Sequence, residues 1–283
     1  MISTRLLVSC LDQPGIVSAI ATFLYERGAN IVDSAQHSTD PVDGTFFMRM
    51  EFVDINDEER VALEESFDQE VARRFSMDWR FSYARDRKRI GILVSRSDHC
   101  LLDLLWRWRR DELEGEIVHV VSNHPDLEEE VSIYGLPYTC IPVANDGKAQ
   151  AEHQLLQLLG GRVDLLVLAR YMQILSGTFL DQIAVPIINI HHSFLPAFVG
   201  ADPYRRALER GVKIIGATAH YVTERLDDGP IIAQGVEPVS HRHDLEELER
   251  IGRDIERVTL ARAVSLHLED RVIVHGNKTF VFD

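Results

Sequence analysis

The chain has 283 residues, of which 45% are hydrophobic and 27% charged, a composition typical of globular proteins long enough for two domains. Its formal net charge of −15 repels phosphate backbones, and its most basic segment is only RDRKR at 85–89, so nucleic acid is not an expected partner. The N-terminus lacks a signal-peptide pattern and no apolar stretch approaches about 18 residues, so we expect a cytoplasmic protein that does not enter a membrane.

An alternation of strand-like and helix-like patterns fills the first 83 residues. Strands are expected at 5–11, 30–38, 44–53 and 76–83, and helices at 14–28 and 57–75. Pro14 and Gly28 stand at the two ends of the first helix, where helix termini favour these residue types. The order β-α-β-β-α-β predicts a ferredoxin-like domain over 1–83.

The segment DQPGIVSAIATFLYERGANI, residues 12–31, resembles the opening of an ACT domain, a family of small regulatory modules that often bind amino acids. The resemblance implies an effector site between the first strand and the first helix, formed by Asp12, Pro14, Gly15, Ile16 and Val17. The alternative is that Asp12, Pro14 and Gly15 only shape the turn and the helix start, as residues at helix N-termini commonly do.

A charged connector at 84–89 separates this part from a predicted second domain at 90–283. Strands are expected at 90–95, 116–123, 136–143, 163–169 and 187–192, and helices at 99–113, 148–161 and 176–183. This alternation predicts a Rossmann-like α/β domain with a mostly parallel sheet, in which ligands collect outside the carboxyl ends of the strands. No G-x-G-x-x-G follows the first strand, so a dinucleotide cofactor is not implied.

Asn189 and His191 stand two apart at the end of a predicted strand, so their side chains point the same way. His220 and Asp227 follow later, so an amide, an imidazole and a carboxylate could meet in one crevice. Taken alone, His191 fits a hydrogen-bonded packing residue better than a functional one, and only its context favours a functional role. We expect no metal, because the histidines lack a recognised ligand spacing.

The segment from Asn189 to Ile232 resembles the core of the folate-dependent formyltransferase family, whose members combine an Asn-x-His motif with a later Asp in a T-x-x-L-D-x-G-P setting. With the ACT-like part and the segments VSNHPD (121–126) and LARYMQILS (168–176), the whole chain resembles the deformylases of this family. The resemblance implies hydrolysis of 10-formyltetrahydrofolate to formate and tetrahydrofolate, with water as the second substrate and no cofactor.

The resemblance also assigns roles to residues. Asn189 would hold the developing oxyanion, and His191 would move or stabilise a proton. Asp227 would orient the water and accept a proton from it, provided that a partly buried site raises its proton affinity. The residues implied to contact the folate are Met172, Gln173, Ile174, Leu175, Val222 and Thr223.

Formyl transfer to an amine acceptor is the alternative activity. Family members that use a phosphorylated glycinamide have a glycine-rich turn after the first strand, whereas the stretch from Ser95 to Asp103 has no glycine and carries Asp98. Water is therefore the expected acceptor. A transfer-RNA acceptor would need a basic surface and an added domain. A non-catalytic amino-acid sensor would leave the Asn-His-Asp set unexplained.

Such a hydrolase is expected to balance one-carbon folate pools and to supply formate for purine biosynthesis. Methionine or glycine is the expected effector of the ACT-like part. We also expect a homo-oligomer, specifically a tetramer, because ACT-type domains usually pair and the strand FFMRMEF at 46–52 could offer an edge or a face.

Overall fold

The computed structural model describes residues 3–40, 42–53, 60–144, 147–196 and 203–282. Contacts divide the chain into two compact units. The first comprises Met1–Arg87 with Glu269–Ile273 and Phe280–Asp283, and the second comprises Lys88–Leu268 with Val274–Thr279. In the described ranges, no helix is long and apolar enough to cross a membrane.

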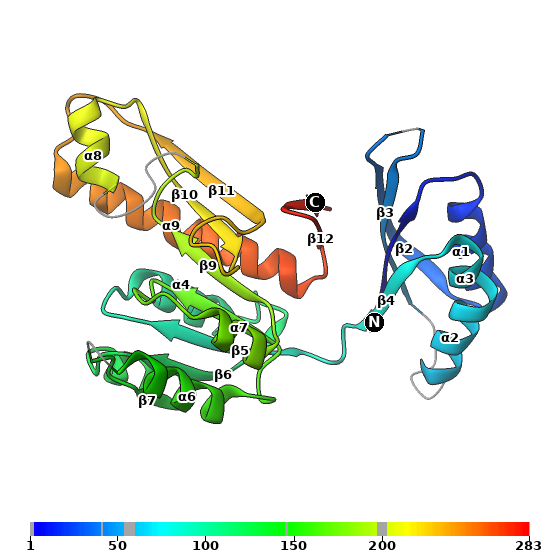
Figure 1. Cartoon of the computed structure of the whole chain (residues 1–283), viewed down its shortest axis with the longest axis horizontal. Coiled ribbons are helices and arrows are strands. Elements are labelled where there is room, and N and C mark those ends of the chain that lie inside the picture. Colours follow the sequence, from blue (N-terminus) through cyan, green and yellow to red (C-terminus); the bar gives the residue numbers. More distant parts are fainter. Residues whose placement is uncertain (1–2, 41, 54–59, 145–146, 197–202, 283) are drawn as a thin grey trace. The chain divides into compact units, whose positions relative to one another are not determined.

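The first unit is an antiparallel sheet with the strand order β2-β3-β1-β4, joined by helices (Figure 1). Its elements are β1 (Thr4–Leu11), α1 (Ile16–Glu26), β2 (Asn30–Ser38), β3 (Thr45–Val53), α2 (Arg60–Phe67), the π-helical turn η2 (Asp68–Ala72), α3 (Arg73–Phe75) and β4 (Asp78–Tyr83). The predicted β-α-β-β-α-β order is confirmed. The expected start of the second helix, 57–59, lies outside the described residues.

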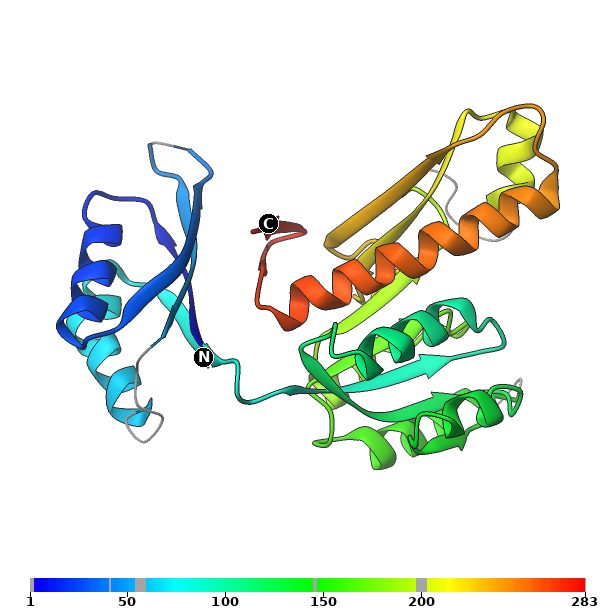
Figure 2. The ribbon, with the colours of Figure 1, turned by 180° about the vertical axis from the view of Figure 1, so that it is seen from behind.

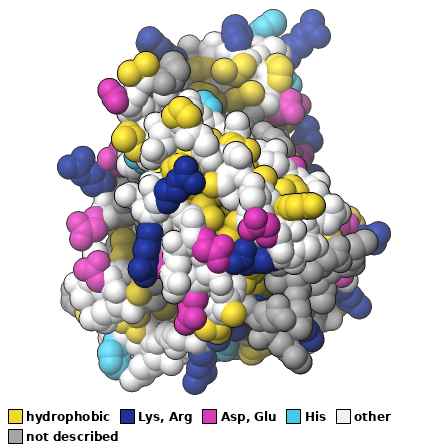
Figure 3. All heavy atoms as spheres, turned by 90° about the vertical axis from the view of Figure 1, so that its right-hand side faces the viewer, with side chains coloured by type: hydrophobic (Ala, Val, Ile, Leu, Met, Phe, Trp, Pro, Cys, Tyr) yellow, Lys and Arg dark blue, Asp and Glu magenta, His cyan; other side chains and the backbone are white. Residues whose placement is uncertain are grey.

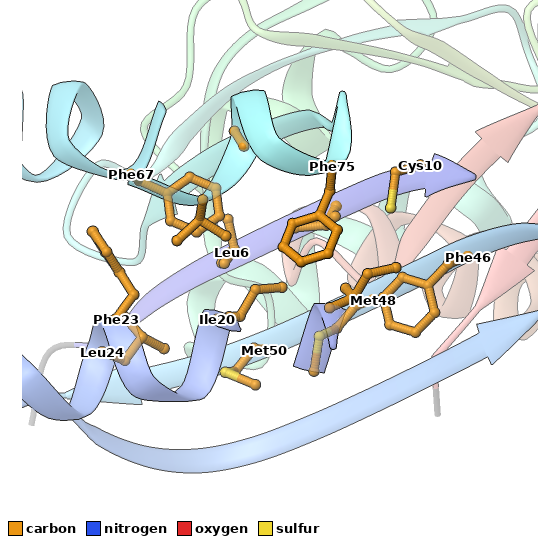
Figure 4. Packing of buried hydrophobic residues seen from close by; sticks show 14 of the residues in the cluster. Leu6, Cys10, Ile20, Phe23, Leu24, Phe46, Met48, Met50, Phe67 and Phe75 are labelled. Atoms are coloured by element: carbon orange, nitrogen blue, oxygen red, sulfur yellow. The ribbon is translucent and has the colours of Figure 1, made fainter. Parts of the chain in front are cut away.

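One face of this sheet packs against the helices. Leu6 and Val8 stand two residues apart on β1, so their side chains point to the same face of the sheet. Both are buried in one cluster with Ile20 and Phe67, and Figure 4 shows Leu6, Ile20 and Phe67 of this cluster. Burial of each such side chain stabilises the fold by roughly 1.5–3 kcal/mol. The apolar side of α1, which repeats every 3.6 residues, thus packs against the apolar side of β1, which repeats every two residues.

The opposite face is covered by the C-terminal segments of the same unit. The Phe280 ring stacks on Phe47 of β3, with ring centroids 4.2 Å apart, and Arg49 donates to the backbone oxygen of Glu269. The predicted edge at FFMRMEF is wrong, because β3 is a central strand flanked by β2 and β1. The side chain of Arg49 is 1% exposed, so this face is occupied within the chain.

The second unit contains a seven-stranded sheet with the order β11-β10-β9-β8-β5-β6-β7 (Figures 1 and 2). Its elements are β5 (Lys88–Val94), α4 (His99–Arg109), β6 (Gly115–Ser122), α5 (Glu128–Ser132), β7 (Tyr138–Cys140), α6 (Lys148–Leu159), β8 (Leu165–Ala169), α7 (Gly177–Ile183), β9 (Ile187–His191), α8 (Pro203–Arg210), β10 (Ile214–Tyr221), β11 (Ile231–Pro238) and α9 (Leu245–Leu268). The residues of the C-terminal strands β12 (Val272–His275) and β13 (Lys278–Val281) are divided between the two units. Strands β5 to β9 run parallel, and β10 and β11 are antiparallel, so the mostly parallel Rossmann-like sheet is confirmed.

Helices cover both faces of this sheet. Leu166 and Leu168 of β8 pack in a cluster with residues of α6 and α7, while α9 contacts α4, β9, β10 and β11. Strand β8 is therefore buried along its whole length, as its uninterrupted apolar sequence predicts. On the face shown in Figure 3, the coloured basic and acidic side chains are interspersed and do not gather by sign.

Candidate functional site

A cavity of about 630 Å³ opens in the second unit, at the carboxyl ends of β8 and β9. Asn189 and His191 line it together because they stand two residues apart on β9. Asp227 joins them from the loop between β10 and β11. That loop closes tightly at Gly229, where a Cβ would collide with the backbone oxygen of Tyr221.

The orientation of the Asn189 amide is fixed by His220 on the neighbouring strand. The two residues are paired in the β9–β10 register, and Asn189 Nδ2 lies 3.2 Å from His220 Nε2. His220 Nδ1 is 2.9 Å from the backbone oxygen of Tyr221, which can only accept, so Nδ1 carries the proton. Burial outweighs that bond and lowers the pKa of His220, so Nε2 is the acceptor for Asn189.

His191 and Asp227 form a buried pair. His191 Nδ1 lies 3.3 Å from Asp227 Oδ1, and each side chain is only 7% exposed. The other ring nitrogen of His191, Nε2, is buried and meets no hydrogen-bond partner among the described residues. A buried polar atom without a hydrogen bond destabilises the fold unless a ligand or a water molecule forms a hydrogen bond with it. His191 is therefore held by Asp227 at one nitrogen and available to a reacting group at the other.

The electrostatics of Asp227 differ from the expectation. Burial alone would raise its pKa, but the hydrogen bond from His191 and the nearby imidazoles of His191, His220 and His192 outweigh burial and lower it. The predicted rise in proton affinity is therefore wrong, because three imidazoles surround the carboxylate. Asp227 also has a left-handed backbone with φ of 55°, a conformation that aspartate adopts more readily than most residues other than glycine.

His192 extends the imidazole cluster. Its ring stacks against His191, with centroids 5.1 Å apart and an interplanar angle of 29°. Burial, then the charges of Arg170 and His191, lower the pKa of His192 to about 4. His192 is consequently a neutral imidazole near pH 7.

The residues implied to contact the folate form one wall of the cavity. Met172, Gln173, Ile174, Leu175, Val222 and Thr223 all line it. Met172 and Ile174 are more than half exposed apolar side chains, while Leu175 is buried in the core cluster with α6 and α7. Ser95 at the end of β5 supports this wall, since its Oγ accepts from the Met172 backbone N–H at 3.0 Å.

The sequence analysis missed a polar group on another wall of the cavity. Arg170, Tyr204, Glu256 and His99 line it and come from four separate segments. One sequence signal existed for Glu256, because it interrupts the apolar face of α9, where most of the other buried positions are apolar or small.

The structure offers one set of possible metal ligands among the described residues. The donor atoms of His99, Cys100 and Glu256 lie within 4.8 Å of one another. However, His99 Nε2 and Tyr204 Oη already hydrogen-bond to the Glu256 carboxylate at 2.8 and 2.6 Å, and Arg170 Nε lies 3.5 Å from it. These partners satisfy the carboxylate, so the donor set fits a hydrogen-bonded cluster better than a cation site.

The first unit carries a separate hollow between β1, α1 and β2. Asp12, Gly15, Ile16 and Val17 line it, but Pro14, the fifth predicted effector residue, does not. The N-cap of α1 is Gly15, which has a φ of 98° and provides no side-chain cap, so the first N–H groups of the helix are available to an anion. Asp12 Oδ2 accepts from Ser38 Oγ at 2.5 Å.

Comparisons with known proteins match both units. The family model described as formyl transferase matches residues 88–264, and the ACT domain model matches residues 4–64. A formyltetrahydrofolate deformylase from Mycobacterium bovis is 56% identical, over 98% of this chain and 90% of its own.

Two solved structures resemble this chain, one over its whole length and one over part of it. A crystal structure of a formyltetrahydrofolate deformylase from Pseudomonas syringae is 47% identical, has a TM-score of 0.94, and covers 100% of this chain and 95% of its own. A glycinamide ribonucleotide transformylase 1 from Symbiobacterium toebii is 33% identical with a TM-score of 0.65, over 70% of this chain and 95% of its own.

Proposed function

This chain belongs to the formyltetrahydrofolate deformylase family, and from that premise we propose that its cavity hydrolyses 10-formyltetrahydrofolate to formate and tetrahydrofolate. The observation that carries the proposal is the meeting of Asn189, His191 and Asp227 in one cavity with the apolar folate wall. Each demand of the hydrolysis then has a residue to meet it.

Asn189 binds the oxyanion in this proposal. Attack of water forms a C–O bond at the formyl carbon, and the carbonyl electrons move to oxygen. One N–H of the Asn189 amide is directed at His220 Nε2, which leaves the second to donate to that oxygen. Oxyanion-hole donors of this type contribute about 2.7–4 kcal/mol to transition-state stabilisation.

His191 and Asp227 handle the protons. Water must lose a proton as it attacks, and the folate nitrogen must gain one as its bond to the formyl carbon breaks. His191 Nε2, without a partner among the described residues, accepts the first proton and donates it to the leaving nitrogen. The ionised Asp227 stabilises the imidazolium formed in between, which its lowered pKa favours.

Hydrolysis is favoured over formyl transfer by the turn after β5. This turn leads into α4 at His99 and has no glycine from Ser95 to Asp103, so it offers no open backbone for a phosphorylated acceptor. His99, the first residue of α4 after this turn, instead hydrogen-bonds to Glu256 within the chain.

The first unit is proposed to sense an amino acid. A zwitterion suits the hollow, because the N-terminus of α1 favours a carboxylate and Asp12 favours an ammonium group. Methionine and glycine are the proposed effectors, since they report opposite ends of one-carbon supply. The roles in folate balance and purine biosynthesis, the cytoplasmic location and the homotetramer stay predictions.

One incubation tests the activity. The full chain is mixed with 10-formyltetrahydrofolate, with and without glycinamide ribonucleotide, and formate and tetrahydrofolate are followed. We expect formate at the same rate in both samples. Release of formyl groups only when the amine is present would overturn the assignment in favour of transfer.

A further inference from the structure

A buried polar wall, defined as Arg170, Tyr204, Glu256 and His99, lines the cavity but has no role in the proposed chemistry. Glu256 is its centre and is 1% exposed. Burial would raise the pKa of Glu256, but the hydrogen bond from His99, the charge of Arg170 and the hydrogen bond from Tyr204 lower it, so the carboxylate is ionised. Buried charges are retained in a fold only when their partners are well placed.

Two local features of the chain, a glycine on α9 and a strained backbone at Arg170, allow this wall to form. Gly252 lies one turn before Glu256 on α9, and a Cβ there would collide with the Tyr204 ring and hydroxyl, so glycine lets Tyr204 reach the carboxylate. Arg170 has a φ of 63°, a strained backbone for a residue with a side chain. Its Nε and Nη1 are buried without a hydrogen-bond partner in the described part of the chain. Nε still forms an ion pair with the Glu256 carboxylate, at 3.5 Å. The strained backbone and the buried donors without hydrogen bonds together indicate a functional requirement.

The polar wall and the folate wall belong to different faces of the sheet. Tyr171, Leu175 and Val222, from the folate side, pack with the cluster that includes α6 and α7. Glu256 and His99 lie on α9 and α4, which pack against each other away from that cluster. The catalytic residues at the end of β9 therefore lie between the two walls.

His192 connects the polar wall to the catalytic residues. Its ring centroid is 5.1 Å from that of His191 and 6.3 Å from that of Tyr204. Arg170 directly follows β8, which pairs with β9 in parallel, so its side chain begins beside the strand that carries Asn189. His192 therefore places Tyr204 and its partners beside the imidazole of His191.

We propose that Arg170, Tyr204, Glu256 and His99 determine the acceptor, leaving room for water at the formyl carbon and excluding amines. The proposal rests on the hydrolytic function proposed above. Water attack forms a C–O bond and breaks the bond to the folate nitrogen, whereas amine attack would form a C–N bond at the same carbon. Because the side chains of the wall line the cavity and are held in place around Glu256, an amine and its substituents meet fixed side chains and the positive charge of Arg170.

The test is the partition of formyl groups between water and an added amine. Wild-type chain and variants are incubated with 10-formyltetrahydrofolate and a fixed concentration of glycinamide or hydroxylamine, and the ratio of formylated amine to formate is measured. Arg170→Gly is the main variant, because glycine accepts the φ of 63° without strain and the fold is expected to persist. Ala184→Gly is the matched control, since Ala184 also has a positive φ, of 50°, but does not line the cavity.

We expect the ratio to rise about 10-fold or more in Arg170→Gly, a size usual for discrimination by a filled pocket, and to stay at the wild-type value in Ala184→Gly. Tyr204→Ala should raise the ratio as well, and Tyr204→Phe should raise it less because the ring is kept. Folded Arg170→Gly and Tyr204→Ala that both keep the wild-type ratio would overturn the proposal. So would their loss of hydrolysis without any transfer, since the wall would then serve the chemistry itself.

The two proposals fail separately. Wild-type chain that releases no formate in water would contradict the hydrolytic function before any variant is compared. Wild-type hydrolysis with unchanged partition in the folded variants would contradict only the role of the polar wall. Circular dichroism and the unfolding midpoint of each variant show whether it is folded.

Discussion

The cavity of the second unit and the hollow of the first differ in how they hold their polar atoms. In the cavity, Asn189, His191, His220 and Asp227 are joined through short polar contacts, and the three ionisable side chains among them are 3–7% exposed. In the hollow, most of the lining residues are exposed, and Asp12 accepts a hydrogen bond from Ser38 Oγ. Chemistry requires groups that are fixed before the substrate arrives, whereas reversible binding can order exposed groups when the ligand binds.

The largest expected effect follows from removing the side chains that are proposed to carry protons. His191→Ala and Asp227→Asn should each lower kcat by about 100-fold or more, because a positioned acid-base group contributes that much. Folate binding should weaken far less, since neither side chain belongs to the apolar wall. Steady-state kinetics and equilibrium folate binding measure the two quantities.

Asp228→Asn is the matched control for that experiment. Its carboxylate neighbours Asp227 in sequence but is 55% exposed and lies 3.7 Å from Arg225. It should keep turnover near the wild-type value. Near-normal kcat in folded His191→Ala or Asp227→Asn would refute the roles assigned to the pair.

A second prediction concerns the oxyanion donor. Asn189→Ala should lower kcat about 100- to 1,000-fold with little change in KM, because the donor acts mainly in the transition state. His220→Gln should have a smaller effect, since it removes only the group that orients the amide. Equal losses in the two variants would show that His220 has a direct role in the reaction.

A third prediction uses the buried imidazole of His192. Its folded-state pKa of about 4 lies below the ordinary 6.5, so the unfolded chain binds more protons between these values and stability falls as the pH falls through this window. The shift corresponds to about 3 kcal/mol. Denaturant unfolding at pH 7 and pH 4 should show this loss in the wild type, and His192→Gln should reduce it. An identical pH dependence in both proteins would contradict the assignment.

The smallest expected effect belongs to the hollow. Asp12→Asn should weaken binding of the proposed amino-acid effector about 10-fold, because one charge-assisted contact is lost. Activity without effector should be unchanged. The control is Asp78→Asn on β4, an exposed aspartate outside the hollow. Calorimetry with methionine and glycine measures binding, and no binding of either to the wild type would leave the hollow without its proposed effector.

If an amino acid binds to the hollow, its effect on turnover shows whether the hollow of the first unit is coupled to the cavity of the second. Coupling between two sites is usually 1–3 kcal/mol, a change of roughly 5- to 150-fold. The wild type should show this change across an amino-acid titration, and Asp12→Asn should require a higher concentration for it. Turnover that ignores every amino acid would make the first unit an assembly device.

Much of the fold was predictable because its signals are local. The alternation along β1, the helix spacing of α1 and the apolar run of β8 each follow from a few neighbouring residues. The placement of Asn189 and His191 on one side of β9 follows from the two-residue period of a strand. Of the edge or face expected at FFMRMEF, the edge is wrong, because strand order in a sheet depends on pairings between distant segments.

The sequence by itself determined the β-α-β-β-α-β plan of the first unit and the Rossmann-like plan of the second, and it predicted the Asn-His-Asp set. Only the tertiary structure decided that His220 orients Asn189, that three imidazoles lower the pKa of Asp227, and that a polar wall lines the same cavity as the folate wall. The physical reason is that secondary structure depends on neighbours in sequence, whereas pKa values and cavity walls depend on neighbours in space. Arg170 and Glu256 stand 86 positions apart in the chain, yet Arg170 Nε lies 3.5 Å from the Glu256 carboxylate.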